Sequence, residues 1–321
     1  MEQYKENYAN LDENTIDIIK SKGYCVIPNV LDKNEINNAK TGLWNTLEYL
    51  TQHLPSPIKR DDSKTWNTYY ELHSNRKLII QNWKIGHSQF VWDIRQNPKV
   101  ANIFSTIWNV EKTDLLTSFD AVSFHIPPEI TGKGFFDGNS WWHTDQAPNN
   151  KSFTCIQGMV LLYDVNPGDA TLRVLENSNQ FHKSFFEENN IDKDSNWYMF
   201  NKKELKYFTN KGCVPINVLA KAGDVILWDS RTIHFGMTPL KERLVPNLRA
   251  NIYVCMTPRY LIDKFNLEKK QKGFNNMEMT SHWPHKIKFF KKYTRNYDII
   301  PNIPDIPKPK LTELGYKLAG F

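Results

Sequence analysis

From about Leu115 onward, short runs of apolar, β-branched and aromatic residues dominate the chain, and each run ends in a turn. The runs are LLTSFDAVSFHI, FTCIQGMVLLYDV, TLRVLEN, VPINVLA, DVILWDS and RANIYVCM, with PPE, NPGD, KAGD and MTPLKE among the turns. Many short strands separated by proline and glycine turns are typical of β-sandwiches and barrels. We therefore predict a mainly β fold with flanking helices, and a jelly roll is the favoured arrangement of its core.

The first third of the chain mixes helix and strand. LDENTIDIIKSKG predicts a helix that stops at Gly23, and YCVIPNVL predicts a short strand. Asp32 and Glu35 have the spacing of a capping box, so a long amphipathic helix should begin there.

The last part of the chain is irregular. DKFNLEKKQKGFNNM indicates a helix, whereas IIPNIPDIPKPK contains too much proline for regular structure beyond extended segments. This part is too short to bury a core of its own. We expect one domain over 1–321, with an N-terminal region (1–114), a β core (115–257) and an extension packed on that core (258–321).

Composition limits the class of protein. The chain has 321 residues, 40% hydrophobic and 24% charged, which fits a globular protein with a sizeable core. The N-terminus is polar and no apolar stretch approaches the roughly 18 residues of a membrane span, so we expect a cytoplasmic protein without a signal peptide. The four cysteines form no Cys-x-x-Cys pair, and we interpret them as reduced, mostly buried thiols.

The net charge of +6 comes partly from one basic run, KIKFFKKYTR, which contains Lys288, Lys291 and Lys292. Such a run could contact phosphates, but a solvated surface is the commoner explanation. A nucleic-acid partner is therefore disfavoured.

The stretch SWWHTDQAP places His143 and Asp145 on one face of an extended strand. Alone, this pair could be an ordinary histidine bonded to a carboxylate. The later stretch KAGDVILWDSRTIHFG adds His234 just beyond a strand, and a jelly roll brings such strand ends together. Two histidines and one carboxylate with open positions suit non-haem iron(II), whereas zinc more often has a closed shell or three ligands and a water.

An arginine on the strand LRANIYVCM calls for a specific partner. Arg249, Asn251 and Tyr253 share one face of this strand. Arg249 could pair with the far carboxylate of a small diacid whose other end chelates the metal, or it could face solvent or pair with a protein acid.

Three aromatic side chains could either line the pocket of the candidate metal site or have a purely structural role. Trp141 and Trp142 cannot both face the same way on a strand, so either could wall a pocket or pack in the core. His125 ends a predicted strand and could line the pocket, although a structural histidine is commoner.

The segments WWHTDQ, CIQGMVLLYDV, DATLRVLENSNQFH, GDVILWDSRTIHFGM and RANIYVCMTPR resemble the phytanoyl-CoA dioxygenase-like branch of the Fe(II)/2-oxoglutarate-dependent oxygenases, from about residue 86 to 259. The later SHWP also looks similar to members of this branch. The resemblance implies a cupin-like double-stranded β-helix. It also implies iron on His143, Asp145 and His234, and 2-oxoglutarate on an arginine after the second histidine.

The co-substrate residues depart slightly from the family pattern. The family's arginine usually follows the second histidine by about eleven residues, but Arg249 follows it by fifteen, and Arg243 lies between them. We prefer Arg249 because its strand is well formed, whereas Arg243 lies in a charged turn. Gln157 falls where relatives place a residue beside the co-substrate, and Asn251 shares the face of Arg249. We expect the side chains of Gln157 and Asn251 to contact the co-substrate.

The implied reaction is decarboxylation of 2-oxoglutarate to succinate coupled to hydroxylation of a small organic substrate, with ascorbate as a candidate additional reductant. Halogenating relatives lack the carboxylate ligand, so Asp145 favours hydroxylation over chlorination. Two alternatives stay open: a nucleic-acid or protein oxygenase with the same iron core, and a non-catalytic jelly-roll binding protein. The fold accepts many substrates, so an acyl-CoA is one option among several.

Overall fold

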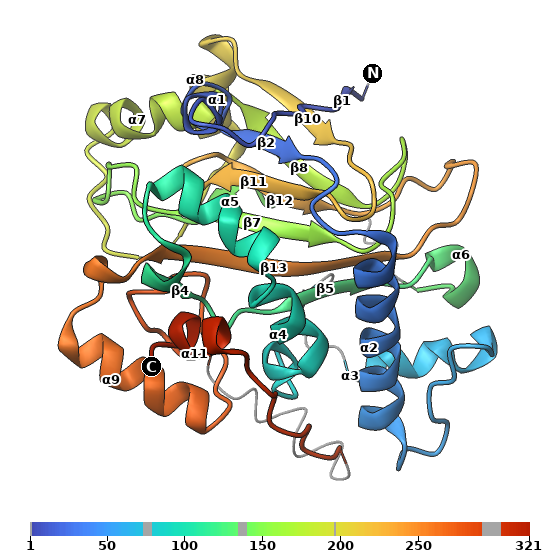
Figure 1. Ribbon diagram of the computed structural model, residues 1–321. Coiled ribbons are helices and arrows are strands. Elements are labelled where there is room, and N and C mark those ends of the chain that lie inside the picture. The colour runs from blue at the N-terminus through green and yellow to red at the C-terminus, as the bar shows by residue number, and fades with distance from the viewer. Residues whose placement is uncertain (1, 73–78, 134–139, 196, 291–302) are drawn as a thin grey trace.

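The computed structural model describes residues 2–72, 79–133, 140–195, 197–290 and 303–321 and contains two facing β-sheets with helices outside them (Figure 1). The six-stranded sheet has the order β1 (Tyr4–Lys5), β10 (Val214–Val218), β8 (Thr171–Glu176), β12 (His234–Met237), β6 (His143–Thr144) and β9 (Tyr198–Met199). The seven-stranded sheet has the order β2 (Tyr24–Ile27), β11 (Val225–Asp229), β7 (Ile156–Leu161), β13 (Arg249–Pro258), β5 (Val122–His125) and β3 (Ile79–Ile80), and β4 (Leu115–Thr117) also pairs with β13.

The chain crosses repeatedly between the sheets, as a jelly roll requires. β6 lies in the six-stranded sheet, β7 in the seven-stranded sheet, β8 and β10 in the six-stranded sheet, and β11, β12 and β13 then alternate. The core strands pair with one another in antiparallel fashion, whereas β1 runs parallel to β10. The predicted mainly β fold with a jelly-roll core and flanking helices is confirmed.

Each sheet has an inner and an outer face. Between the sheets, Met159, Ile226 and Trp228 contact Val174 and Ile216 in one apolar cluster. Successive side chains of a strand point to opposite faces of its sheet. Every second residue of the seven-stranded sheet therefore points away from this cluster and toward the helices.

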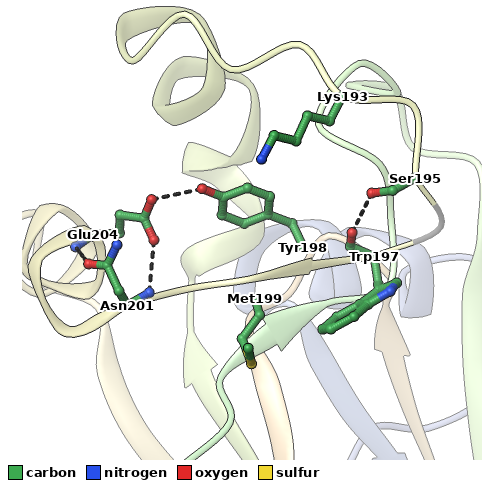
Figure 2. A pocket seen from close by; sticks show the side chains of 7 residues that line it. All are labelled: Lys193, Ser195, Trp197, Tyr198, Met199, Asn201 and Glu204. Atoms are coloured by element: carbon green, nitrogen blue, oxygen red, sulfur yellow. Dashed lines mark hydrogen bonds between the residues drawn. The ribbon is translucent and has the colours of Figure 1, made fainter.

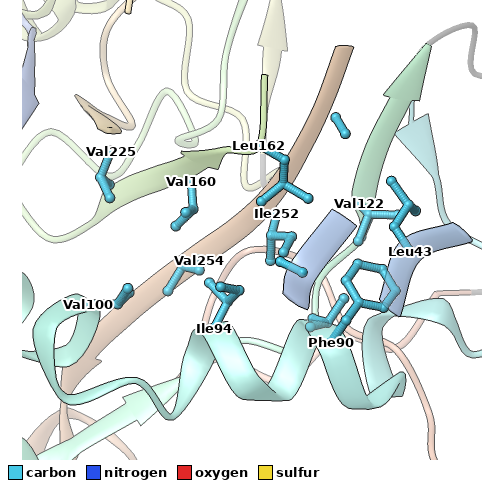
Figure 3. Packing of buried hydrophobic residues seen from close by; sticks show 14 of the residues in the cluster. Leu43, Phe90, Ile94, Val100, Val122, Val160, Leu162, Val225, Ile252 and Val254 are labelled. Atoms are coloured by element: carbon cyan, nitrogen blue, oxygen red, sulfur yellow. The ribbon is translucent and has the colours of Figure 1, made fainter. Parts of the chain in front are cut away.

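The outer face of the seven-stranded sheet is covered by α2 (Lys33–Thr51), α4 (Gln89–Arg95) and α5 (Pro98–Trp108). Figure 3 shows Phe90 and Ile94 of α4 facing Ile252 and Val254 of β13. The predicted alternation along β13 is therefore correct, and its polar residues Arg249 and Asn251 are left to point between the sheets.

Local signals set the ends of the first helices. α1 (Thr15–Lys22) ends at Gly23, whose φ of 88° places it in the left-handed region that glycine adopts easily. At the start of α2, the Asp32 side chain accepts hydrogen bonds from the backbone N–H groups of residues 34 and 35, and Glu35 closes the capping box. Both predicted helices and the strand between them are present.

The remaining helices are short and lie around the sheets. They are α3 (Tyr69–Leu72), α6 (Pro128–Thr131), α7 (His182–Glu188), α8 (Lys202–Asn210), α9 (Lys264–Asn275) and α11 (Glu313–Ala319), and the 3-10 turns η1 (Ser63–Thr68), η2 (Ile85–His87), η3 (Lys112–Asp114), η4 (Ser178–Phe181) and η5 (Arg259–Leu261). The helix expected after Pro258 is α9, and the proline-rich residues 303–312 form no helix or strand. No described helix combines the length and apolar character that a membrane crossing requires.

Candidate active site

The two histidines of the sequence pattern meet across a β-ladder. His143 in β6 and His234 in β12 are register partners, and their ring centroids are 4.4 Å apart. Asp145 follows β6 at once, and its backbone N–H donates to the carbonyl of Ser230 over 3.0 Å. One donor atom of each of the three side chains lies within 4.8 Å of the other two.

The two oxygens of the Asp145 carboxylate face the two imidazoles. His143 Nε2 is 3.4 Å from Asp145 Oδ1, and His234 Nε2 is 3.3 Å from Asp145 Oδ2. Metal bonds of about 2.1 Å at right angles separate two ligand atoms by about 3 Å. The three side chains therefore fit a single divalent ion with only a small adjustment.

Backbone carbonyls orient both imidazole rings. His143 Nδ1 is 3.0 Å from the carbonyl of Trp141, and His234 Nδ1 is 2.9 Å from the carbonyl of Thr232. A carbonyl only accepts, so each Nδ1 carries the proton and each Nε2 offers its lone pair to the centre. Metal-binding histidines are usually fixed in this way.

Burial and charge shift the pKa values of His143 and Asp145 in the direction that favours cation binding. His143 and His234 are 5% and 4% exposed. Burial, together with the neighbouring His234, lowers the pKa of His143. Burial alone would raise the pKa of Asp145, but His282 and the two triad histidines hold it well below its ordinary value. Neutral imidazoles beside an ionised carboxylate are the forms that bind metal.

Gln157 supports the carboxylate. This β7 side chain donates from Nε2 to Asp145 Oδ2 over 2.9 Å and lies 3.3 Å from Ser230 Oγ. The structure places Gln157 directly against the triad, where it fixes the rotation of the Asp145 carboxylate.

Arg249 is a buried cation at the start of β13. It is 5% exposed and donates from Nη1 to the hydroxyl of Ser123. With its amide oriented to satisfy both side chains, Asn251 accepts from Arg249 Nε at 3.1 Å and from Nη2 at 3.0 Å. Among the ion pairs of the described residues, none joins Arg249 to a protein carboxylate.

Arg243, the alternative anchor, already has carboxylate partners. Its Nε lies 2.6 Å from Glu129 Oε1, and its Nη1 lies 2.9 Å from Asp169 Oδ1. Its side chain is 2% exposed. The charge of this guanidinium is thus neutralised within the protein, whereas Arg249 has hydrogen bonds to Ser123 and Asn251 but no carboxylate among the described residues.

The two adjacent tryptophans point in opposite directions, as alternation requires. Trp142 is 8% exposed and packs against Phe235, with ring centroids 4.5 Å apart. Trp141 is 41% exposed and stacks on the His143 imidazole at 4.2 Å. His125 is buried and is the register partner of Arg249, so it lies beside the arginine.

One site residue comes from the C-terminal extension and was not predicted. His282 Nε2 donates to the backbone carbonyl of Asp145 over 2.9 Å. His282 belongs to the segment SHWP, which is similar to the oxygenase family in sequence. A contact across 137 positions leaves no periodic signal in the sequence, however. In the basic run, Lys288 is exposed, whereas Lys291 and Lys292 lie outside the described residues.

A protein-family model described as "Phytanoyl-CoA dioxygenase (PhyH)" matches residues 19–238, more than half of the chain and all three triad positions. The chain belongs to this family. The match starts earlier than the expected residue 86 and ends before Arg243 and Arg249, so the choice between these two arginines depends on the structure.

A relative from Aspergillus versicolor described as "Ava biosynthesis cluster protein O" is 28% identical over 210 residues, which are 63% of this chain and 65% of the relative. The match thus spans less than two thirds of that relative's length.

Two solved structures have a TM-score of 0.50 with this chain. The non-heme alpha ketoglutarate dependent carbocyclase SnoK from nogalamycin biosynthesis is 12% identical, over 77% of this chain and 84% of SnoK. EvdMO1 is 16% identical, over 76% of this chain and 49% of EvdMO1. At these identities the similarity shows the shared fold alone.

Proposed function

We propose that this protein is an Fe(II)- and 2-oxoglutarate-dependent hydroxylase of a small organic molecule. The observation that carries the proposal is the triad: two fixed imidazole Nε2 atoms, each within 3.4 Å of a different oxygen of Asp145. Such a set occupies one face of an iron ion and leaves the opposite face for a co-substrate and oxygen. His143, Asp145 and His234 are the proposed ligands.

Arg249 is the proposed anchor for the co-substrate 2-oxoglutarate. A guanidinium binds a carboxylate through two parallel hydrogen bonds, and Arg249 is buried without a protein carboxylate among the described residues. In this proposal Arg249 binds the distal carboxylate of 2-oxoglutarate. Asn251 and Ser123 hold the guanidinium in place, and Gln157 holds Asp145.

These contacts indicate which part of the reaction iron would supply and which part the protein supplies. Bound iron would supply the oxygen activation that no side chain can perform. The protein orients the imidazoles through the carbonyls of residues 141 and 232, keeps Asp145 ionised, and positions 2-oxoglutarate by its far end. The carboxylate ligand supports hydroxylation over halogenation, because a halide would need its position on the metal.

Hydroxylation is one outcome among those that this fold hosts, since SnoK, of the same fold, is described as a carbocyclase. The experiment that separates them is product analysis with 2-oxoglutarate, Fe(II) and ascorbate under ¹⁸O₂. A hydroxylase incorporates one labelled oxygen into the product and one into succinate. A product without the label would contradict hydroxylation.

The metal assignment has its own test. The wild-type chain should bind one Fe(II) under anaerobic dialysis, and His143→Ala, Asp145→Ala and His234→Ala should each lose that ion. Stoichiometric iron in all three variants would refute the triad as the iron site and favour the non-catalytic alternative.

A further inference from the structure

Three exposed apolar side chains lie around His143 on the side of the proposed metal centre. They are Trp141, Trp197 and Met199, with exposed fractions of 41%, 48% and 55%. Single exposed apolar residues are ordinary on protein surfaces, but a contiguous group beside a catalytic centre indicates a binding surface. We call these three residues the aromatic platform.

The β-ladder explains why Trp197 and Met199 reach the centre. β9 is the edge strand next to β6, and Met199 is the register partner of His143. Directly opposed residues point to the same side of a sheet. Figure 2 shows Trp197 and Met199 on one side of this segment and Tyr198 on the other.

Both indoles contact the same imidazole. Trp141 stacks on His143 with centroids 4.2 Å apart and an interplanar angle of 9°. Trp197 approaches the same ring edge-on, at 6.3 Å and 79°. Much of each indole is still exposed, so each has a surface available for a ligand next to the metal centre.

The charged neighbours of this segment lie on its other side. Figure 2 shows Lys193 and Glu204 on the side of Tyr198, and the Tyr198 hydroxyl donates to Glu204 Oε1 over 2.7 Å. The adjoining surface pocket of 340 Å³ is lined by these residues together with Trp197 and Met199.

We propose that the aromatic platform binds the prime substrate, and that this substrate carries a flat, conjugated and largely uncharged ring system. Indole faces favour stacking on flat rings, and the methionine thioether adapts to an apolar edge. No platform residue offers a cation for a phosphate or carboxylate. This inference rests on the proposed function, because it takes the platform's ligand to be the molecule oxidised at the iron.

The test compares two probes with the same carbon skeleton, 2-naphthol and trans-2-decalol, of which only the first is flat and aromatic. Calorimetric titration of the full chain, with and without Fe(II) and 2-oxoglutarate, should show 2-naphthol binding at least about tenfold more tightly. Trp197→Ala should weaken 2-naphthol binding about tenfold, and Trp197→Phe should restore part of it.

Tyr260→Ala is the matched control, because Tyr260 is an aromatic residue 75% exposed on a different element. It should leave 2-naphthol binding unchanged, and Trp197→Ala should keep the iron stoichiometry of the wild type. Equal loss in the two alanine variants, no loss in Trp197→Ala, or equal affinity for the two probes would overturn the platform. Tighter binding of a thymidine oligonucleotide, lost in Trp197→Ala, would assign the surface to nucleic acid instead.

The two proposals fail in different ways. Absence of iron binding with intact naphthol binding would contradict the oxygenase but leave the platform as a ligand site. Iron binding and 2-oxoglutarate decarboxylation without naphthol binding would contradict the platform alone.

Discussion

Replacing Arg249 by alanine removes the part of the proposed co-substrate site that recognises the far carboxylate. The guanidinium is 5% exposed and is held by Asn251 at 3.1 and 3.0 Å, so it is already ordered before 2-oxoglutarate binds. Losing a charge-assisted pair in a desolvated pocket costs about 2 to 5 kcal/mol, because the ligand carboxylate is left without a partner. We expect the Kd of 2-oxoglutarate to rise by roughly 30-fold to several-thousand-fold.

The assay is titration of 2-oxoglutarate into the iron-loaded, anaerobic protein. The affinity for a second ligand, 2-oxopentanoate, should be measured in the same assay. This compound has a methyl group where 2-oxoglutarate has the distal carboxylate. The wild type should prefer 2-oxoglutarate by a factor close to that lost in Arg249→Ala, and the variant should no longer distinguish the two ligands. Arg249→Lys should fall between, because an ammonium cannot form the two parallel bonds.

Arg243→Ala is the control. It breaks the ion pairs with Glu129 and Asp169, so we expect a lower Tm and an unchanged Kd for 2-oxoglutarate. A large rise of that Kd in Arg243→Ala, with none in Arg249→Ala, would refute the reasoning and exchange the roles of the two arginines.

Three further predictions test the surroundings of the site. Gln157→Ala should weaken iron binding by about 10- to 100-fold, because Asp145 loses a 2.9 Å hydrogen bond from Gln157, and unchanged affinity in metal titrations would contradict this role. Burial lowers the pKa of His87 from 6.5 to about 3. Between pH 7 and pH 5 the unfolded chain therefore binds a proton at His87 that the folded chain does not, and this residue alone should lower stability by about 2 kcal/mol over that range. Urea unfolding should show a flatter pH dependence in His87→Gln, and an identical slope would disprove the assignment. Gly23→Ala should destabilise the fold by at least about 1 kcal/mol, because a Cβ there meets Thr232 Oγ1 at 2.6 Å and φ is 88°. Since the Thr232 carbonyl orients His234, iron affinity should also drop in Gly23→Ala, and a variant with wild-type Tm and affinity would rule this out.

Local patterns in the sequence determined the elements. The capping box at Asp32, the stop at Gly23 and the alternation along β13 depend on neighbours within a few residues, and each is present as predicted. The residue types of His143, Asp145 and His234 likewise limited the chemistry, because imidazole and carboxylate are the donors that a non-haem iron site uses.

Only the tertiary structure decided which distant groups complete the site. Spacing along the chain could not choose between Arg243 and Arg249. The choice depends on tertiary contacts, because Glu129 and Asp169 neutralise Arg243, whereas no described carboxylate pairs with Arg249. The contact of His282 with Asp145 spans 137 positions, and that of Trp197 with His143 depends on the pairing of β9 with β6. Such contacts result from sheet register and chain crossing, which a pattern of nearest neighbours does not encode.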